Sequence, residues 1–303
     1  MTVPGSNVGQ VARSCGDAFS DAAAELNGTD LSPRSQLREA YGLFRIVEDT
    51  VVILDDPQSA SEDSYTFVLV HGGCHDGSLW QPVIERLEQF GHTAYGPTVA
   101  GHGKDVPKNV THAESTRSIV EFILDRDLTD FILVGHGYAG TIISKVVEVM
   151  PERVRRLVFW SAYVLNDGES ALEMLPDSVE LLTQMAADSA DNTFMIPFDM
   201  WRDVFINDGE PDLVQHAYDQ LSPEPFGPWA EPLNMEKFHS LHTPRSFLVG
   251  AADMVMPPGD SGWHPRMSSR LGKFRLVRMP GSHEAIFTNP IGLAEKFIEA
   301  GCD

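Results

Sequence analysis

The hydrophobic pattern repeats along the middle of the chain, and the repeat predicts an α/β architecture. Three nearly continuous apolar runs, Tyr65–Val70, Asp130–Val134 and Val154–Trp160, are typical of strands buried on both faces. Amphipathic segments with helical spacing lie between the first two runs, at Leu79–Phe90 and Glu114–Leu124. This alternation predicts an α/β fold with a mostly parallel central sheet flanked by helices.

The alternation stops after Ala162 and resumes near residue 241. Residues 164 to 240 carry short helical segments rich in Met, Phe and Trp, with several prolines. Arg245–Val249 and Phe274–Met279 are again typical of strands, and Gly292–Ala300 of a closing helix. We therefore expect a helical cap, inserted after the strand that ends near Trp160.

The N-terminal region differs from the rest because it is polar and only weakly periodic. Leu43–Val47 and Thr50–Leu54 are two β-rich runs that predict a hairpin. Two interpretations of the preceding arm stay open: a partly ordered extension, or a segment that packs against the main domain or a second subunit of a homodimer. The predicted parts are an N-terminal arm at 1–42, a first part of the α/β core at 43–163, a cap or lid at 164–240 and a second part of the core at 241–303.

Charge and cysteine content restrict the partners. The 303 residues include 22 Lys and Arg against 44 Asp and Glu, a net charge of −22, which disfavours nucleic acid and anionic membranes. No apolar run approaches the roughly 18 residues that span a bilayer, and residues 1–10 do not resemble a signal peptide. Three widely spaced cysteines form no disulfide or zinc pattern. We expect a cytoplasmic protein that acts on a hydrophobic small molecule.

The loops that follow the predicted strands hold the candidate chemistry, since ligands of such sheets bind beyond the carboxyl ends of the strands. The loop His71–His75 reads His-Gly-Gly-Cys-His, and its glycines allow backbone N–H groups to approach a ligand. A tight strand–helix turn would need the same glycines. The loop Gly135–Gly140 reads Gly-His-Gly-Tyr-Ala-Gly and precedes a helix.

The run Phe131–Gly140 resembles the nucleophile elbow of α/β-hydrolases, a strand–turn–helix with the pattern G-x-S-x-G. Together with Phe67–His75 it is similar to the branch that contains plant methylesterases, hydroxynitrile lyases and bacterial esterases, over roughly residues 65–300. The chain departs from the pattern at the nucleophile, because Gly137 stands where the family has serine. Ala139 also replaces a glycine.

The resemblance implies a catalytic triad in the chain order of this fold. Asp253, after the strand Arg245–Val249, matches the triad acid, and Asp167 is a reserve acid. His283 matches the catalytic base. The N–H groups of Gly73 and Tyr138 would form the oxyanion hole. The residues expected to contact substrate are Cys74, His75, Trp160, Met195 and Trp201. We expect no cofactor and no metal, since His239 and His242 have no third ligand nearby.

Two rival functions are disfavoured by single residues. Gly135, Gly137 and Gly140 satisfy the dinucleotide-binding pattern G-x-G-x-x-G, but the next strand does not end on the acid that this pattern requires. Hydroxynitrile lyases carry a lysine after the catalytic histidine, and here that residue is Glu284.

Three explanations of Gly137 stay open. The chain is a disabled variant of a carboxylic ester or lactone hydrolase with an apolar, aromatic substrate; glycine cannot itself attack a carbonyl. Alternatively, it lacks the serine naturally and uses Asp253 and His283 as a dyad for lyase, cyclase or water-activating chemistry. The third explanation is a non-catalytic receptor for a small molecule.

Overall fold

The structure, a computed structural model, describes residues 12–14, 44–47, 50–53, 64–256 and 259–302. The chain divides into two compact units, residues 1–63 and 64–303.

The first unit contains a three-stranded antiparallel sheet in the order β1-β3-β2. The strands β2 (Phe44–Val47) and β3 (Thr50–Ile53) form the predicted hairpin, and β1 (Ala12–Ser14) pairs with β3. We expected the core to begin at residue 43, but the hairpin belongs to this first unit. The other residues of the predicted arm lie outside the described residues.

The second unit is built on a parallel six-stranded sheet in the order β11-β10-β7-β6-β4-β5. Five of the six strands, all except the short edge strand β5, lie within two residues of the runs given above. The strands are β4 (Thr66–Val70), β5 (Thr93–Tyr95), β6 (Phe131–His136), β7 (Val154–Trp160), β10 (Arg245–Gly250) and β11 (Arg275–Met279).

Neighbouring residues of the central strands enter different cores. In β4, Val68 and Val70 belong to one buried apolar cluster, whereas Phe67 and Leu69 belong to another. Successive side chains of a strand point to opposite faces, so a sheet covered on both sides needs apolar residues at every position. This requirement explains the continuous apolar runs of the sequence.

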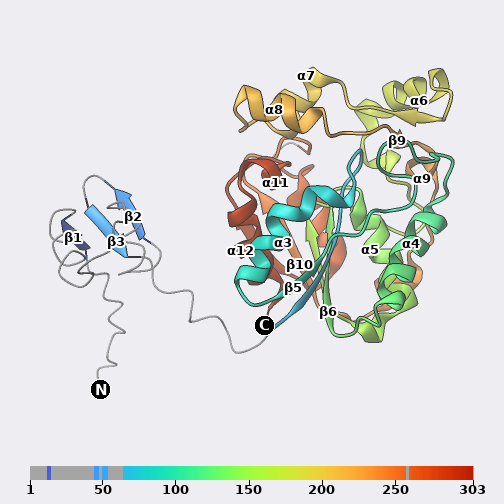
Figure 1. Ribbon diagram of the computed structural model, residues 1–303. Coiled ribbons are helices and arrows are strands. Elements are labelled where there is room, and N and C mark those ends of the chain that lie inside the picture. Colours follow the sequence, from blue (N-terminus) through green and yellow to red (C-terminus); the bar gives the residue numbers. More distant parts are fainter. Residues whose placement is uncertain (1–11, 15–43, 48–49, 54–63, 257–258, 303) are drawn as a thin grey trace. The chain divides into compact units, whose positions relative to one another are not determined.

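Helices cover both faces of this sheet (Figure 1). The helices α3 and α12 pack together on one face, and α4 and α5 on the other. Thr111 begins α4 with a capping box, in which it and Glu114 bond each other's backbone N–H groups. The helices of this layer are α3 (Gln81–Gln89), α4 (His112–Asp125), α5 (Ala139–Val149), α10 (Glu236–Ser240), α11 (Ala285–Thr288) and α12 (Pro290–Gly301).

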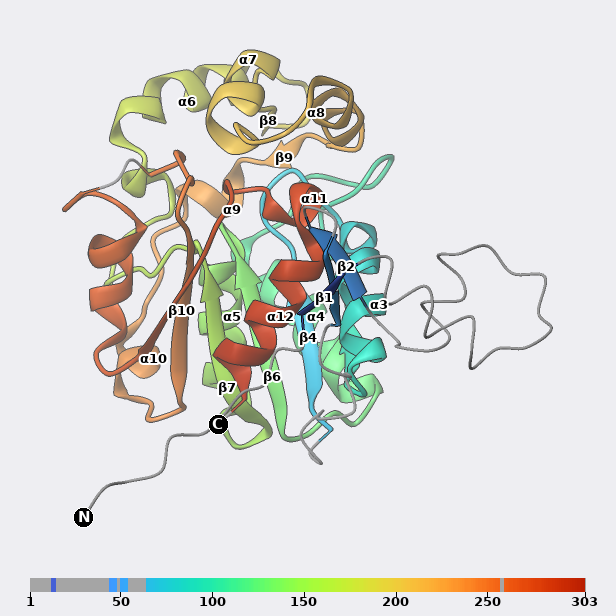
Figure 2. The same cartoon turned by 90° about the vertical axis from the view of Figure 1, so that its left-hand side faces the viewer.

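A third layer of short helices lies at one end of the sheet, as Figures 1 and 2 show. It falls within the range predicted as a cap, 164–240, and its action as a lid stays a prediction. Its helices and strands are α6 (Val179–Asp188), β8 (Thr193–Phe194), α7 (Phe198–Met200), α8 (Pro211–Tyr218), β9 (Glu224–Pro225) and α9 (Gly227–Ala230).

Short 3-10 or π-type turns cover Gly77–Trp80, Pro151–Arg153, Leu172–Met174, Pro176–Ser178, Trp201–Phe205, Trp263–Met267 and Ser268–Leu271. None of the helices in the described part of the chain has the length and apolar character needed to cross a membrane.

Candidate active site

The predicted nucleophile position lies at the tip of a tight turn between β6 and α5. Gly137 has a φ of +53°, in the left-handed region that favours glycine. Its N–H donates to the Trp160 carbonyl at 3.2 Å, and its carbonyl accepts from the Tyr163 N–H at 3.0 Å. A Cβ added to Gly137 would lie 3.2 Å from Nε2 of His283. A side chain at position 137 would therefore face the imidazole.

Asp253 and His283 form a buried pair beside this turn. Asp253 follows β10 and His283 follows β11, and Nδ1 of the imidazole lies 2.8 Å from Oδ2 of the carboxylate. Oδ1 of Asp253 accepts the Val255 N–H at 3.0 Å, which fixes the loop. Because Nδ1 is engaged, Nε2 is the nitrogen that faces Gly137. The arrangement has the geometry of a carboxylate-oriented general base.

Burial and charge act in opposite directions on this pair. Burial favours a neutral Asp253, but the charge and hydrogen bond of His283 outweigh it and hold the pKa of the carboxyl below its usual value. Burial likewise disfavours a charged His283, but the Asp253 carboxylate outweighs it and raises the pKa of the imidazole. The pair therefore favours the charged imidazolium that a general base becomes.

The two predicted oxyanion donors lie on the wall of the same pocket. Gly73 belongs to the loop after β4, and Tyr138 to the turn before α5. No hydrogen bond from either N–H occurs among the described residues. A Cβ on Gly73 would lie 3.2 Å from the Trp229 ring, so a side chain at this position would require the ring to shift slightly. Both N–H groups stay predictions as oxyanion donors.

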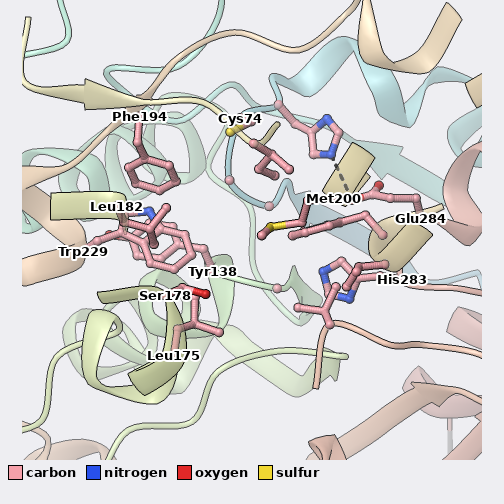
Figure 3. A pocket seen from close by; sticks show the side chains of 18 of the residues that line it. Cys74, Tyr138, Leu175, Ser178, Leu182, Phe194, Met200, Trp229, His283 and Glu284 are labelled. Atoms are coloured by element: carbon pink, nitrogen blue, oxygen red, sulfur yellow. Dashed lines mark hydrogen bonds and ion pairs between the residues drawn. The ribbon is translucent and has the colours of Figure 1, made fainter. Parts of the chain in front are cut away.

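A cavity of about 180 Å³ lies between these loops and the third layer of helices. Its wall combines apolar side chains with a polar corner, and Figure 3 shows Tyr138, Trp229 and Phe194 grouped on the side away from His283 and Glu284. The predicted contacts Cys74 and His75 line it. The other lining residues are Gly72, Gly73, His136, Gly137, Tyr138, Tyr163, Leu175, Ser178, Leu181, Leu182, Phe194, Ile196, Pro197, Met200, Val204, Phe205, Trp229, Val255, His283 and Glu284.

Three residues that we expected to contact substrate are not on this wall. Trp160 is the last residue of β7 and points to the α3/α12 face, where it stacks on His136 with ring centroids 3.9 Å apart. Trp201 is fully buried, and its Nε1–H donates to the Val214 carbonyl at 3.2 Å. Met195 packs against the same cluster as Trp201. These three side chains build cores instead of the cavity.

Cys74 does not replace the missing nucleophile. Burial, reinforced by the charge of Glu224, raises the pKa of the Cys74 thiol well above its usual value. The reactive form of cysteine is the thiolate, which this environment disfavours. The thiol therefore contributes to the wall and not to the reaction.

Glu224 is a buried residue of the site that the sequence did not indicate. Its carboxylate accepts the Cys74 N–H at 2.6 Å and the Trp229 Nε1–H at 2.7 Å, and it pairs with His102 at 3.1 Å. Burial opposes its ionisation, but the charge of His102 and these hydrogen bonds lower the pKa of the carboxyl. Cys74 has a φ of +64°, so the Glu224 contact holds the loop in an unusual conformation.

The reserve acid and the histidine considered as a metal ligand lie away from the cavity. Oδ1 of the reserve acid Asp167 accepts the Met235 N–H at 2.8 Å, and Asp167 does not line the cavity. His239 bonds the Leu165 carbonyl. The described residues that bring metal-ligating atoms together are instead His136, His283 and Glu284, at the polar corner.

Comparison with known proteins places this architecture among known hydrolases. A model described as "Alpha/beta hydrolase family" matches residues 67–296. A solved extracellular alpha/beta-hydrolase from a Paenibacillus species is 39% identical with a TM-score of 0.75, covering 79% of this chain and 100% of that one. It is described as sharing structural and functional homology with tobacco salicylic acid binding protein 2.

Curated relatives include esterases. A carbendazim hydrolyzing esterase of Nocardioides sp. (strain SG-4G) is 34% identical over 116 residues, 37% of this chain and 48% of that protein. Methylesterase 1 of Arabidopsis thaliana is 27% identical over 262 residues, 77% of this chain and 94% of that protein. This chain spans about half the length of the first curated relatives that it matches.

Proposed function

The chain belongs to the alpha/beta hydrolase family, and we propose that its site is that of a carboxylic ester or lactone hydrolase from which the nucleophile is missing. The observation that carries this proposal is the free Nε2 of the Asp253–His283 pair, which faces the Cβ position of Gly137. A serine Oγ at this position would have its base beside it. The names of the relatives, an esterase and a methylesterase, agree with this reaction.

In the serine form, each of these groups would have a defined role in the reaction. The hydroxyl would attack the carbonyl carbon while His283 takes its proton and Asp253 stabilises the imidazolium. The N–H groups of Gly73 and Tyr138 would hold the oxyanion. His283 would then protonate the leaving alcohol. In the second half of the reaction, His283 would take a proton from a water molecule as that water attacks the acyl carbon, and it would return the proton to the serine oxygen as the acid leaves.

The cavity supports an apolar, aromatic substrate. Tyr138 stacks on Trp229 with ring centroids 4.6 Å apart and nearly parallel planes, and Phe194 meets Trp229 edge-on. Such walls favour flat apolar groups. The described homology of one relative to a salicylic acid binding protein agrees with an aromatic ligand.

The test is Gly137→Ser, assayed on aryl esters, methyl esters and lactones, with Gly137→Ala as the matched control. Both variants add a Cβ at a positive φ, but only serine adds a nucleophile. We expect kcat/KM to rise about a thousandfold or more for serine alone. Equal rates for the two variants would reject the proposal.

A second candidate is hydrolysis by water that the Asp253–His283 dyad activates. The intact pair, facing a position without a side chain, is the observation that favours it. This candidate requires that any turnover by the present chain disappears in His283→Ala; turnover that survives the change would eliminate it.

A further inference from the structure

The polar corner of the cavity brings together three residues that can bind a metal ion. One ligating atom each of His136, His283 and Glu284 lies within 4.8 Å of the other two. All three residues are buried, with at most 4% of their surface exposed. His136 ends β6, whereas His283 and Glu284 belong to the loop after β11. Figure 3 shows His283 and Glu284 on the same side of the cavity.

Each of the three residues already uses its other polar atom. Nε2 of His136 lies 3.1 Å from the His283 carbonyl, which can only accept, so this neutral ring keeps its lone pair on Nδ1. Nδ1 of His283 is bonded to Asp253, which leaves the lone pair on Nε2. Oε1 of Glu284 lies 3.3 Å from Nε2 of His75, which leaves Oε2. Carbonyl and carboxylate partners of this kind orient the ligands in known metal sites.

The corner therefore presents acceptors without a matching donor. Within the described part of the chain, neither Nδ1 of His136 nor Oε2 of Glu284 has a hydrogen-bond partner. Leaving a buried acceptor unsatisfied is unfavourable, because it has lost its hydrogen bonds to water. One water molecule has two protons for the three lone pairs, whereas a single cation can serve all of them.

Two glycines lie beside these nitrogen atoms. A Cβ on Gly72 would lie 3.0 Å from Nδ1 of His136, and a Cβ on Gly137 would lie 3.2 Å from Nε2 of His283. A side chain at either position would therefore crowd the nitrogen beside it. The Gly137 space is the one that a serine side chain would fill.

We propose that His136, His283 and Glu284 bind one divalent transition-metal ion, such as Zn²⁺. Two imidazoles and a carboxylate are a common catalytic zinc ligand set, and they leave a fourth position open for water. That water would stand near the position of the missing serine hydroxyl. In ester hydrolysis its oxygen would bond to the acyl carbon, the acyl–oxygen bond would break, and its protons would end on the alcohol and the acid.

Titration of the metal-free protein with Zn²⁺ tests the site by calorimetry, and the visible spectrum of bound Co²⁺ reports on its ligands. We expect one equivalent to bind at about pH 8, and binding should weaken in acid because protons compete with the metal for its ligands. Glu284→Gln, of the same size, should weaken binding about 100-fold or more, and Asp253→Asn about 10–100-fold through His283. His216→Gln, at an exposed histidine of α8, is the matched control and should leave the affinity unchanged.

Two results would overturn the proposal: no saturable binding by the folded protein, or equal affinity in Glu284→Gln and the parent chain. Thermal unfolding shows whether each variant is folded. If Glu284→Gln does not fold, Gly137→Ser serves in its place, because its hydroxymethyl group occupies the space beside Nε2 and should weaken metal binding; unchanged affinity there would count against the site. The esterase proposal is judged separately, on the catalytic rate of Gly137→Ser.

Discussion

Among the buried acid–histidine pairs near the cavity, Asp253–His283 and Glu224–His102 differ in what the histidine leaves free. Asp253–His283 and Glu224–His102 are both buried, with nitrogen–oxygen distances of 2.8 and 3.1 Å. His283 uses Nδ1 and turns Nε2 toward Gly137. His102 uses both nitrogens, because its Nδ1 lies 3.1 Å from the Ala100 carbonyl.

The difference separates a reactive pair from a structural one. In both pairs burial opposes the charged imidazole and the carboxylate outweighs it, so the pKa of each histidine is raised and the shift alone does not distinguish them. The free nitrogen does distinguish them, since a base must reach the proton that it removes. Glu224 instead connects β9 to the loop of Cys74, next to the predicted oxyanion donor Gly73. It is a positioning residue.

The largest effect is expected from breaking the reactive pair in the serine form. In a Gly137→Ser chain, Asp253→Asn should lower kcat by about 10⁴-fold, because an amide donor favours the wrong imidazole tautomer. The free energy of unfolding should change much less than this activity. Steady-state kinetics and urea unfolding of the same samples measure both effects. A loss of kcat below tenfold would mean that Asp253 does not orient the base.

Breaking the structural pair, Glu224–His102, should change the free energy of unfolding more than it changes the activity. Glu224→Gln removes the charge that faces the buried His102 and weakens the acceptor of the Cys74 N–H. Breaking a buried pair costs about 3–5 kcal/mol, and we expect about 3 kcal/mol because glutamine keeps the shape. Urea unfolding measures this loss.

In the Gly137→Ser background, Glu224→Gln should raise KM and lower kcat by about tenfold at most, and it should leave the pH at half-maximal kcat/KM unchanged because that pH reports His283. A displaced pH profile would place Glu224 among the groups that titrate in the reaction. Glu148→Gln, at a buried glutamate distant from the cavity wall, controls for the general loss of a buried carboxylate.

The fold could be predicted because the central parallel strands are mostly apolar on both faces, a pattern that β4 and β6 carry within a few consecutive residues. Gly137, Asp253 and His283 could be named because the loops after β6, β10 and β11 resemble those that carry the triad of α/β-hydrolases, and the carboxyl ends of parallel strands meet at one edge. Their catalytic roles stay predictions. The structure does bring them together.

Glu224 could not be predicted in the same way. Its partners Cys74 and His102 come from distant parts of the chain, and Trp229, five residues away, does not by itself mark a buried acid. The expected substrate contacts Trp160 and Trp201 were misplaced for a related reason. An aromatic residue near a site fits a wall or a core equally well, and its register on the strand or helix decides which.

The smallest effect concerns acid, and it extends the comparison to a histidine that must stay neutral. His71 accepts the Val99 N–H at Nε2, at 3.0 Å, and its Nδ1 lies 2.9 Å from the Gly72 carbonyl. Burial, and after it the charge of His102, lower the pKa of His71 to about 3. The unfolded chain binds a proton near its ordinary pKa of about 6.5 and the folded chain does not, so stability must fall as the pH drops below about 6.5.

Each such proton contributes at most about 1.4 kcal/mol per pH unit. Above pH 6.5 the raised pKa of His102 acts with the opposite sign, because its stabilisation is lost as the pH rises through the folded value. The shifts of His71 and His102 therefore act on the free energy of unfolding in opposite directions below and above about pH 6.5. His71→Gln keeps an acceptor for the Val99 N–H and should reduce the slope between pH 6.5 and 5 by about one proton. Urea unfolding at several pH values measures the slopes, and equal slopes for the two chains would show that His71 titrates alike in the folded and unfolded states.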